Sequence, residues 1–152
     1  MSAVIRTLAV DDLEPLHALE VAAQPLPWSD DQLLLELVND NATVLGMLES
    51  AHGLVGHVVM RRMVDELWVL NICVHPDHRR HGHARALLDA AMQHGRAKLM
   101  TSLWLEVREG NESARSLYAA IGLIETAKRP AYYPPIPPST TRETAVLMSR
   151  SL

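Results

Sequence analysis

The chain has 152 residues, 48% hydrophobic and 21% charged, which predicts one globular domain over residues 1–152. A net charge of −4 argues against a nucleic-acid-binding protein, because such proteins need a basic face to displace counterions from phosphates. The single cysteine, Cys73, lies in an apolar run and indicates a buried structural thiol in a reducing compartment. No run of eighteen apolar residues occurs, so we expect a soluble, cytoplasmic protein that does not contact membranes.

A strand and two helices are predicted at the N-terminal end. Residues 4–6 can form a short strand, after which Asp11 can cap a helix. Ser29 followed by Gln32 is a capping box and predicts a second helix over about residues 30–38. The first helix has an inward stripe of leucines: Leu13, Leu16 and Leu19.

Three strands and a long helix are expected in the middle of the chain. Residues 42–49 and 54–63 predict a hairpin, and residues 67–74 are apolar enough for a strand buried on both faces. A helix follows Gly82, with apolar residues at helical spacing that we expect to face inward: Leu87, Leu88, Ala91, Met92 and Leu99.

The C-terminal part predicts a strand over residues 103–107, then a helix with Asn111 as its cap. Five prolines between residues 129 and 141 exclude a helix or central strand there and predict an extended loop before a last strand at 143–149. The element order β-α-α-β-β-β-α-β-α-β-β predicts an α/β fold without internal repeats.

A possible phosphate-binding loop connects the strand at 67–74 to the helix that follows it. The loop reads Arg79-Arg80-His81-Gly82-His83-Ala84, a match to R/Q-x-x-G-x-G/A. A glycine at a helix start lets backbone N–H groups approach a phosphate, and the helix dipole favours negative charge there. The two arginines add charge-assisted donors, so we expect a pyrophosphate site.

The loop resembles the coenzyme A loop of the GNAT (Gcn5-related) N-acetyltransferases. Over essentially its whole length the chain resembles the bacterial ribosomal-protein-alanine N-acetyltransferases of the RimI type within that family. Besides the loop, the matching motifs are Pro27-Trp28-Ser29, Asp65-Glu66 leading into Leu70–Val74, His75-Pro76-Asp77, Leu103–Arg108, Asn111-x-x-Ala114-x-x-Leu117-Tyr118 and Tyr132-Tyr133-Pro134. This resemblance implies a central, mostly antiparallel sheet flanked by helices and an acetyl-CoA co-substrate.

The resemblance also implies roles for particular residues. Glu106 is the expected general base, since a desolvated carboxylate on an apolar strand is a better proton acceptor, and Tyr118 is the expected general acid toward the coenzyme sulfur. The coenzyme is expected to contact Ile72, Cys73, Val74, Arg79, Arg80, His81, Gly82, His83, Ala84 and Asn111. The acceptor peptide is expected near Trp28, Asp65, Glu66, Tyr132 and Tyr133.

Several functions remain open at this stage. The acceptor implied by the resemblance is the N-terminal alanine of a small-subunit ribosomal protein, with other protein N-termini, lysine or a small amine as alternatives. A non-catalytic acetyl-CoA-binding module would need neither Glu106 nor Tyr118. Four histidines invite a metal interpretation, but their spacing is irregular and no second ligand set accompanies them, so no metal is expected: His75, His78, His81 and His83. The oligomeric state is not predicted.

Overall fold

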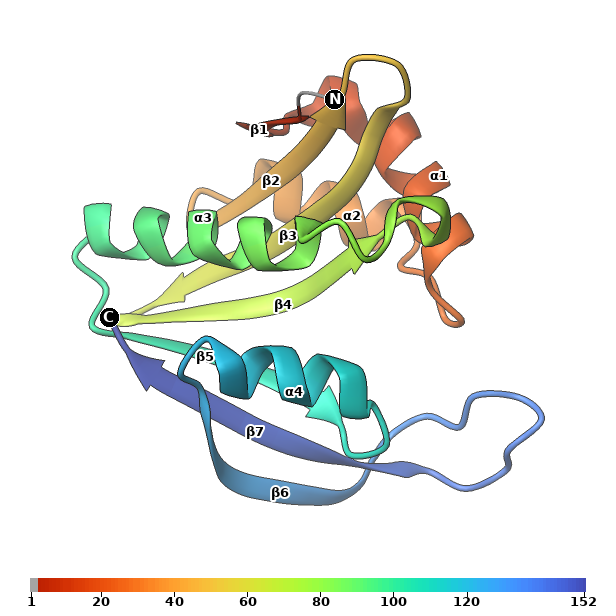
Figure 1. Cartoon of the computed structure of the whole chain (residues 1–152), viewed down its shortest axis with the longest axis vertical. Coiled ribbons are helices and arrows are strands. Elements are labelled where there is room, and N and C mark those ends of the chain that lie inside the picture. The colour runs from red at the N-terminus through yellow and green to blue at the C-terminus, as the bar shows by residue number, and fades with distance from the viewer. Residues whose placement is uncertain (1–2) are drawn as a thin grey trace.

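One seven-stranded sheet runs through the computed structural model, which describes residues 3–152 (Figure 1). The strand order is β1-β2-β3-β4-β5-β7-β6, and every neighbouring pair is antiparallel except β4 and β5. The fold class expected from the sequence, a mostly antiparallel mixed sheet flanked by helices, is therefore confirmed. The strands are β1 Ala3–Thr7, β2 Ala42–Glu49, β3 Gly53–Met63, β4 Glu66–Val74, β5 Ser102–Arg108, β6 Ile124–Tyr133 and β7 Glu143–Ser151.

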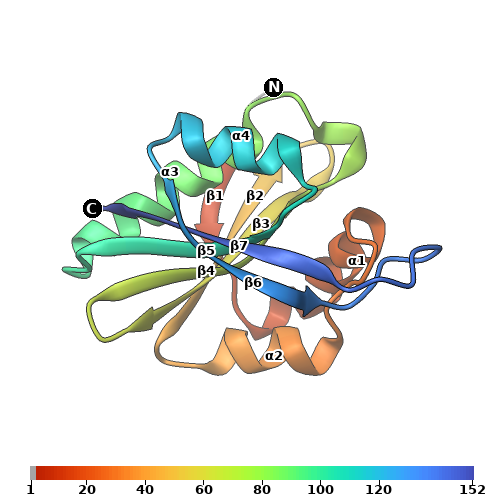
Figure 2. The ribbon, with the colours of Figure 1, turned by 90° about the horizontal axis from the view of Figure 1, so that it is seen from below.

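Four helices cover the two faces of the sheet (Figure 2). Helices α1 (Leu13–Ala23) and α2 (Asp30–Val38) lie on one face, and α3 (His83–Ala97) and α4 (Glu112–Ala120) lie on the other. Two single 3₁₀ turns, η1 (Val10–Asp12) and η2 (Pro76–His78), complete the described elements. Across residues 3–152, no helix combines the length and apolar character that crossing a membrane would require.

Two apolar cores follow from this layering. The larger lies between the sheet and the α3/α4 pair and includes Leu87 and Leu88 of α3 with Leu103 and Leu105 of β5. The smaller lies under α1 and α2 and contains Leu16 and Leu33. Because the sheet is buried on both faces only in its middle, its central strands carry the apolar runs seen in the sequence.

The capping box predicted for α2 is present: Gln32 N donates to Ser29 Oγ over 3.2 Å, and Ser29 N donates to Gln32 Oε1 over 2.8 Å. The cap predicted for α1 is wrong by one residue. Asp12, not Asp11, precedes that helix, and its carboxylate accepts from Ala9 N and pairs with Arg6 instead of capping α1. The turn η1 displaces the helix start, because an aspartate can satisfy nearby backbone donors in more than one way.

Two other predictions are corrected by the structure. Leu99 does not face inward: α3 ends at Ala97, and Leu99, with φ of +63°, is 83% exposed. The proline-rich segment is a loop only from residue 134, because β6 continues through Pro130 to Tyr133. Proline is tolerated there since β6 is the edge strand and needs hydrogen bonds on one side only.

Candidate active site

The parallel strands β4 and β5 separate partway along their length. They pair only over Glu66–Val69 and Ser102–Leu105, and beyond this point they diverge (Figure 1). The register of β4 against β3 shifts between Val69 and Asn71, which leaves Leu70 as a bulge that bends the strand. The backbone of Ile72–Val74 therefore has no β5 partner and offers its hydrogen-bonding groups to an extended ligand.

A cleft of about 690 Å³ lies at this opening. Its walls are the end of β4, the loop before α3 and the first turns of α3 and α4. The structure brings every predicted coenzyme-contacting residue except His81 to this cleft. The lining residues are Gln24, Ile72, Cys73, Val74, His78, Arg79, Arg80, Gly82, His83, Ala84, Arg85, Asn111, Ser113, Ala114, Leu117 and Tyr118.

The loop at one end of the cleft has the backbone expected of an anion site. Gly82 is the N-cap residue of α3 and has φ of +77°, a left-handed conformation that glycine adopts without steric cost. The first N–H groups of a helix have no partner within it and carry the positive end of its dipole. At the start of the fifteen-residue α3 these groups lie beside the cleft, so an anionic diphosphate is favoured here.

The two loop arginines have different surroundings. Arg79 braces the loop, because its Nε donates to Val74 O over 3.1 Å and its Nη2 donates to Ala23 O over 3.2 Å. Arg80 is exposed and makes no ion pair within residues 3–152. Arg80 is thus the loop arginine with a guanidinium available to a phosphate.

Asn111 and Tyr118 reach the cleft from α4. Asn111 caps this helix, as predicted, by accepting from Ala114 N over 3.2 Å. Tyr118 is buried, and its burial raises the pKa of its phenol to about 12. The phenol therefore keeps its proton at neutral pH and can act as a hydrogen-bond donor in the cleft.

Glu106 lies on the other side of the opening. Leu105 and Val107 belong to the core under α3 and α4, so strand alternation directs Glu106 toward the face that carries α1 and α2. Its side chain is 18% exposed, and its Oε1 lies 3.8 Å from Arg129 Nη1. Its Oε2 is buried and has no hydrogen-bond partner in the described chain. This oxygen is free to accept a proton.

The tyrosine pair lies near Glu106. Burial, and then the negative charge of Glu106, raise the pKa of Tyr133. Tyr132 is exposed, and its ring meets that of Tyr133 edge-on at 5.1 Å. Arg108 stacks on Tyr133 at 4.7 Å and also donates to Pro134 O, which anchors the following loop. In Figure 2 this loop and α1 lie at the same end of the sheet.

The proposed acceptor-binding residues do not all gather at this place. Trp28 is partly buried against the small core with Leu33, in the loop between α1 and α2. Asp65 and Glu66 lie at the opposite end of β4, about six residues or ~20 Å from Ile72. They contact Thr101 and Trp68 there. The structure does not bring them to the cleft.

The buried carboxylate of Glu20 forms hydrogen bonds to the loop before α2 and to β4. The sequence analysis did not identify it. Glu20 is fully buried; its Oε1 accepts from Trp28 N over 2.9 Å, and its Oε2 accepts from Asn71 Nδ2 over 3.1 Å. His57 Nε2 lies 2.7 Å and the Cys73 thiol 3.4 Å from the same Oε2. The sequence did indicate that Glu20 faces inward, because Glu20 follows Leu16 by four residues and so lies on the same helix face.

The charge state of this cluster is set by its contacts. Burial raises the pKa of Glu20, but the hydrogen bonds and charge of His57 and the donors from Trp28 and Asn71 outweigh it and lower the pKa to about 2. Burial, then the Glu20 charge, raise the pKa of the Cys73 thiol. Cys73 is therefore a buried neutral thiol, as predicted, and not a nucleophile at neutral pH.

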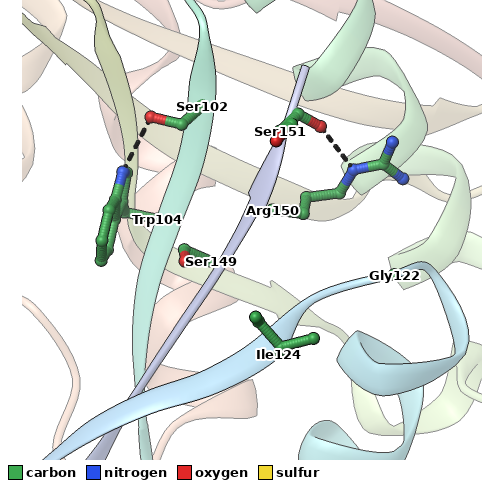
Figure 3. A pocket seen from close by; sticks show the side chains of 7 residues that line it. All are labelled: Ser102, Trp104, Gly122, Ile124, Ser149, Arg150 and Ser151. Carbon is green, nitrogen blue, oxygen red and sulfur yellow. Dashed lines mark hydrogen bonds between the residues drawn. The ribbon is translucent and has the colours of Figure 1, made fainter.

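A second hollow, of about 540 Å³, lies at the far end of β5 and beside β7 (Figure 3). Its charged residue, Arg150, donates to Ser151 O and to Ile121 O. Trp104 Nε1 donates to Ser102 Oγ across the same surface (Figure 3). No acidic side chain is among the residues that line this hollow.

The opening between the parallel strands β4 and β5, with the start of α3 beside it, suits an extended ligand that carries negative charge. The family model of the acetyltransferase (GNAT) family matches residues 9–123, and the chain belongs to this family. It is an acetyl-CoA-dependent N-acetyltransferase, as predicted from the sequence.

Relatives of this chain within the family are named for one particular acceptor. The [ribosomal protein bS18]-alanine N-acetyltransferase of Haemophilus ducreyi is 32% identical over 147 residues, covering 96% of this chain and 98% of the relative. The Escherichia coli K12 enzyme of the same name is 31% identical over 146 residues, covering 95% of each. The crystal structure of the E. coli ribosomal-protein-S18-alanine N-acetyltransferase superposes with a TM-score of 0.91 at 28% identity, covering 99% of this chain and 94% of that one.

Proposed function

We propose that this chain transfers the acetyl group of acetyl-CoA to the α-amino group of a protein N-terminus, with the N-terminal alanine of ribosomal protein bS18 as its acceptor. The relatives named for this reaction, which match nearly the full chain, support the acceptor. The observation that carries the proposal is the position of Glu106 and Tyr118. They approach one opening in the sheet from opposite faces, so coenzyme and amine can enter from different sides.

In this proposal the coenzyme is held by backbone and loop. The N–H groups at the start of α3, together with Arg80, bind the diphosphate, and Gly82 leaves room for its approach. The unpaired backbone of Ile72–Val74 hydrogen-bonds the pantetheine arm as an added strand would. Asn111 and Tyr118 lie at the α4 side, where the thioester sulfur would be placed.

The transfer is a direct attack within a ternary complex. The amine nitrogen forms a bond to the thioester carbon, and the carbon–sulfur bond breaks. Glu106 accepts the proton of the amine, directly or through one water, on its unpartnered Oε2. Tyr118 donates its phenolic proton to the departing thiolate. Neither proton transfer uses a metal ion.

The chemistry of the base favours an α-amino acceptor over lysine. An α-amino group has a pKa of about 8 and is partly neutral at pH 7, whereas lysine at about 10.4 is almost fully protonated. A single carboxylate is sufficient to deprotonate an α-amino acceptor, but it is poorly matched to the higher pKa of a lysine side chain. Tyr133 lies near Glu106 and Tyr132 packs against Tyr133, so we assign both, with Trp28, to the path of the acceptor peptide.

The acceptor class is tested by incubation with acetyl-CoA and three amines, followed by mass spectrometry. The amines are a peptide beginning Ala-Arg, the same peptide with a blocked N-terminus and an internal lysine, and a polyamine. We expect acetylation of the α-amino group of the first peptide alone. Faster modification of the lysine or the polyamine would replace the proposed acceptor. Coenzyme binding without modification of any amine would indicate a non-catalytic binding module.

A further inference from the structure

Histidines are concentrated in the segment before α3, and none of them takes part in the two proposed proton transfers. In the sequence, no second set of metal ligands accompanies these histidines. The fold supplies that set from the β2–β3 hairpin, since the end of β2 and the following turn lie against this segment. Glu49 is the last residue of β2, and His52 lies in the turn. Both are brought next to His78 of η2.

The carboxylate of Glu49 is the centre of this cluster. Its side chain is only 3% exposed, although both of its chain neighbours are more accessible. Its Oε1 lies 2.8 Å from His83 Nε2, whereas its Oε2 lies 3.4 Å from His78 Nδ1. This Oε2 is buried and has no hydrogen-bond partner in the described chain. A buried carboxylate oxygen without a donor is costly, so a cation at this position would stabilise it.

The arrangement has the dimensions of a transition-metal site. One ligand atom each from Glu49, His52 and His78 lie within 4.8 Å of one another. Bonds of about 2.0 to 2.2 Å in a tetrahedron separate the ligand atoms by roughly 3.4 Å, which is the separation found between Glu49 Oε2 and His78 Nδ1. His83, on the other carboxylate oxygen, fixes the orientation of the Glu49 group.

We propose that Glu49, His52 and His78 bind a Zn²⁺-type divalent cation, with water as the fourth ligand. Two imidazoles and one carboxylate suit zinc and its neighbours in the transition series better than magnesium or calcium, which prefer oxygen alone. His52 is exposed, so the ion has a route in from solvent. None of the three ligands is assigned a part in the proton transfers of the acetylation step.

The ion would join the β2–β3 turn to η2, and His78 of η2 also lines the coenzyme cleft. A ligand that binds only the folded chain raises its stability in proportion to the logarithm of its concentration. We therefore expect added zinc to raise the midpoint of thermal unfolding. Magnesium at the same concentration should not.

The experiment is equilibrium dialysis of the purified full chain with zinc, together with cobalt substitution monitored by visible absorption. We expect one ion per chain and the intense bands of a tetrahedral cobalt site. His52→Gln is the most informative variant, because this exposed turn residue can be changed without disturbing the core. Binding should fall at least tenfold in His52→Gln and in Glu49→Gln. The control His17→Gln, which removes a half-exposed histidine paired with Asp30 on the other face, should bind like the parent.

Glu49, His81 and His83 form a second group of possible ligands, so the test must distinguish this set from the proposed one. Loss of binding in His81→Gln with full binding in His52→Gln would overturn the proposed ligand set. Absence of stoichiometric binding by the folded parent chain would overturn the site altogether. Neither result depends on acetylation activity, so the proposed enzymatic function is judged separately.

Discussion

Two glycines of this chain have a similar positive φ but differ in location, which makes a matched pair of substitutions possible. Gly82 has φ of +77° at the start of α3, and Gly53 has φ of +72° at the start of β3. At each, an added Cβ would meet no atom within 4 Å. Replacement by alanine therefore introduces backbone strain alone, about 1 to 2 kcal/mol, at both positions.

The two substitutions should separate stability from coenzyme binding. Gly82→Ala and Gly53→Ala are expected to lower the free energy of unfolding by similar amounts. Only Gly82→Ala places a methyl group where the diphosphate must approach the backbone, so only it should weaken acetyl-CoA binding. We expect a loss of at least about tenfold, equivalent to about 1.4 kcal/mol.

Isothermal titration calorimetry with acetyl-CoA measures the affinity, and urea unfolding measures the stability. A Gly82→Ala protein that is destabilised like Gly53→Ala but binds acetyl-CoA as tightly as the parent would refute the phosphate-loop assignment. An equal loss of affinity in both variants would refute it as well, because the effect would then come from general destabilisation.

Three further predictions concern ionisable side chains. Glu106→Gln should lower the acetylation rate by about 10²-fold or more without changing coenzyme affinity, because the amide cannot accept a proton; an unchanged rate across pH removes Glu106 from the mechanism. Tyr118→Phe should lower kcat by roughly 10²-fold at unaltered coenzyme affinity, and a kcat equal to that of the parent would exclude Tyr118 as the acid. Glu20, whose pKa falls from 4.5 to about 2 on folding, should contribute about 3 kcal/mol of stability that is complete above pH 4.5 and is lost as the pH falls toward 2. Urea unfolding of the parent and Glu20→Gln should thus show a stability difference that narrows with acidification, and a constant difference contradicts this reasoning.

The features that sequence alone predicted well depend on nearby residues. The capping box of Ser29 and Gln32 and the loop around Gly82 are each complete within a few positions, so their geometry is encoded locally. The fold class could also be predicted from the sequence, because apolar periodicity and motif order indicate each element. The end of α3 was misjudged, since Leu99 continues the apolar spacing beyond the point where the chain turns left-handed.

The features that sequence did not predict depend on distant residues. The bulge at Leu70, where β4 stops pairing with β5, is a property of the pairing of β4 with β3. Asp65 and Glu66 lie at the start of β4, whereas the cleft lies at the other end of this strand. Glu20 contacts His57 and Glu49 contacts His83, and each of these contacts joins residues more than thirty positions apart along the chain.

The central claim is that acetyl-CoA and a protein N-terminus meet at the β4/β5 opening. The most direct measurement is the affinity of a conjugate that joins coenzyme A, through an acetyl bridge, to the α-nitrogen of a peptide beginning Ala-Arg. Because linked ligands bind with a high effective concentration, we predict at least about 10²-fold tighter binding than coenzyme A alone. A conjugate through the lysine side chain of the blocked peptide should gain little. Equal affinities for coenzyme A and the Ala-Arg conjugate would contradict the account.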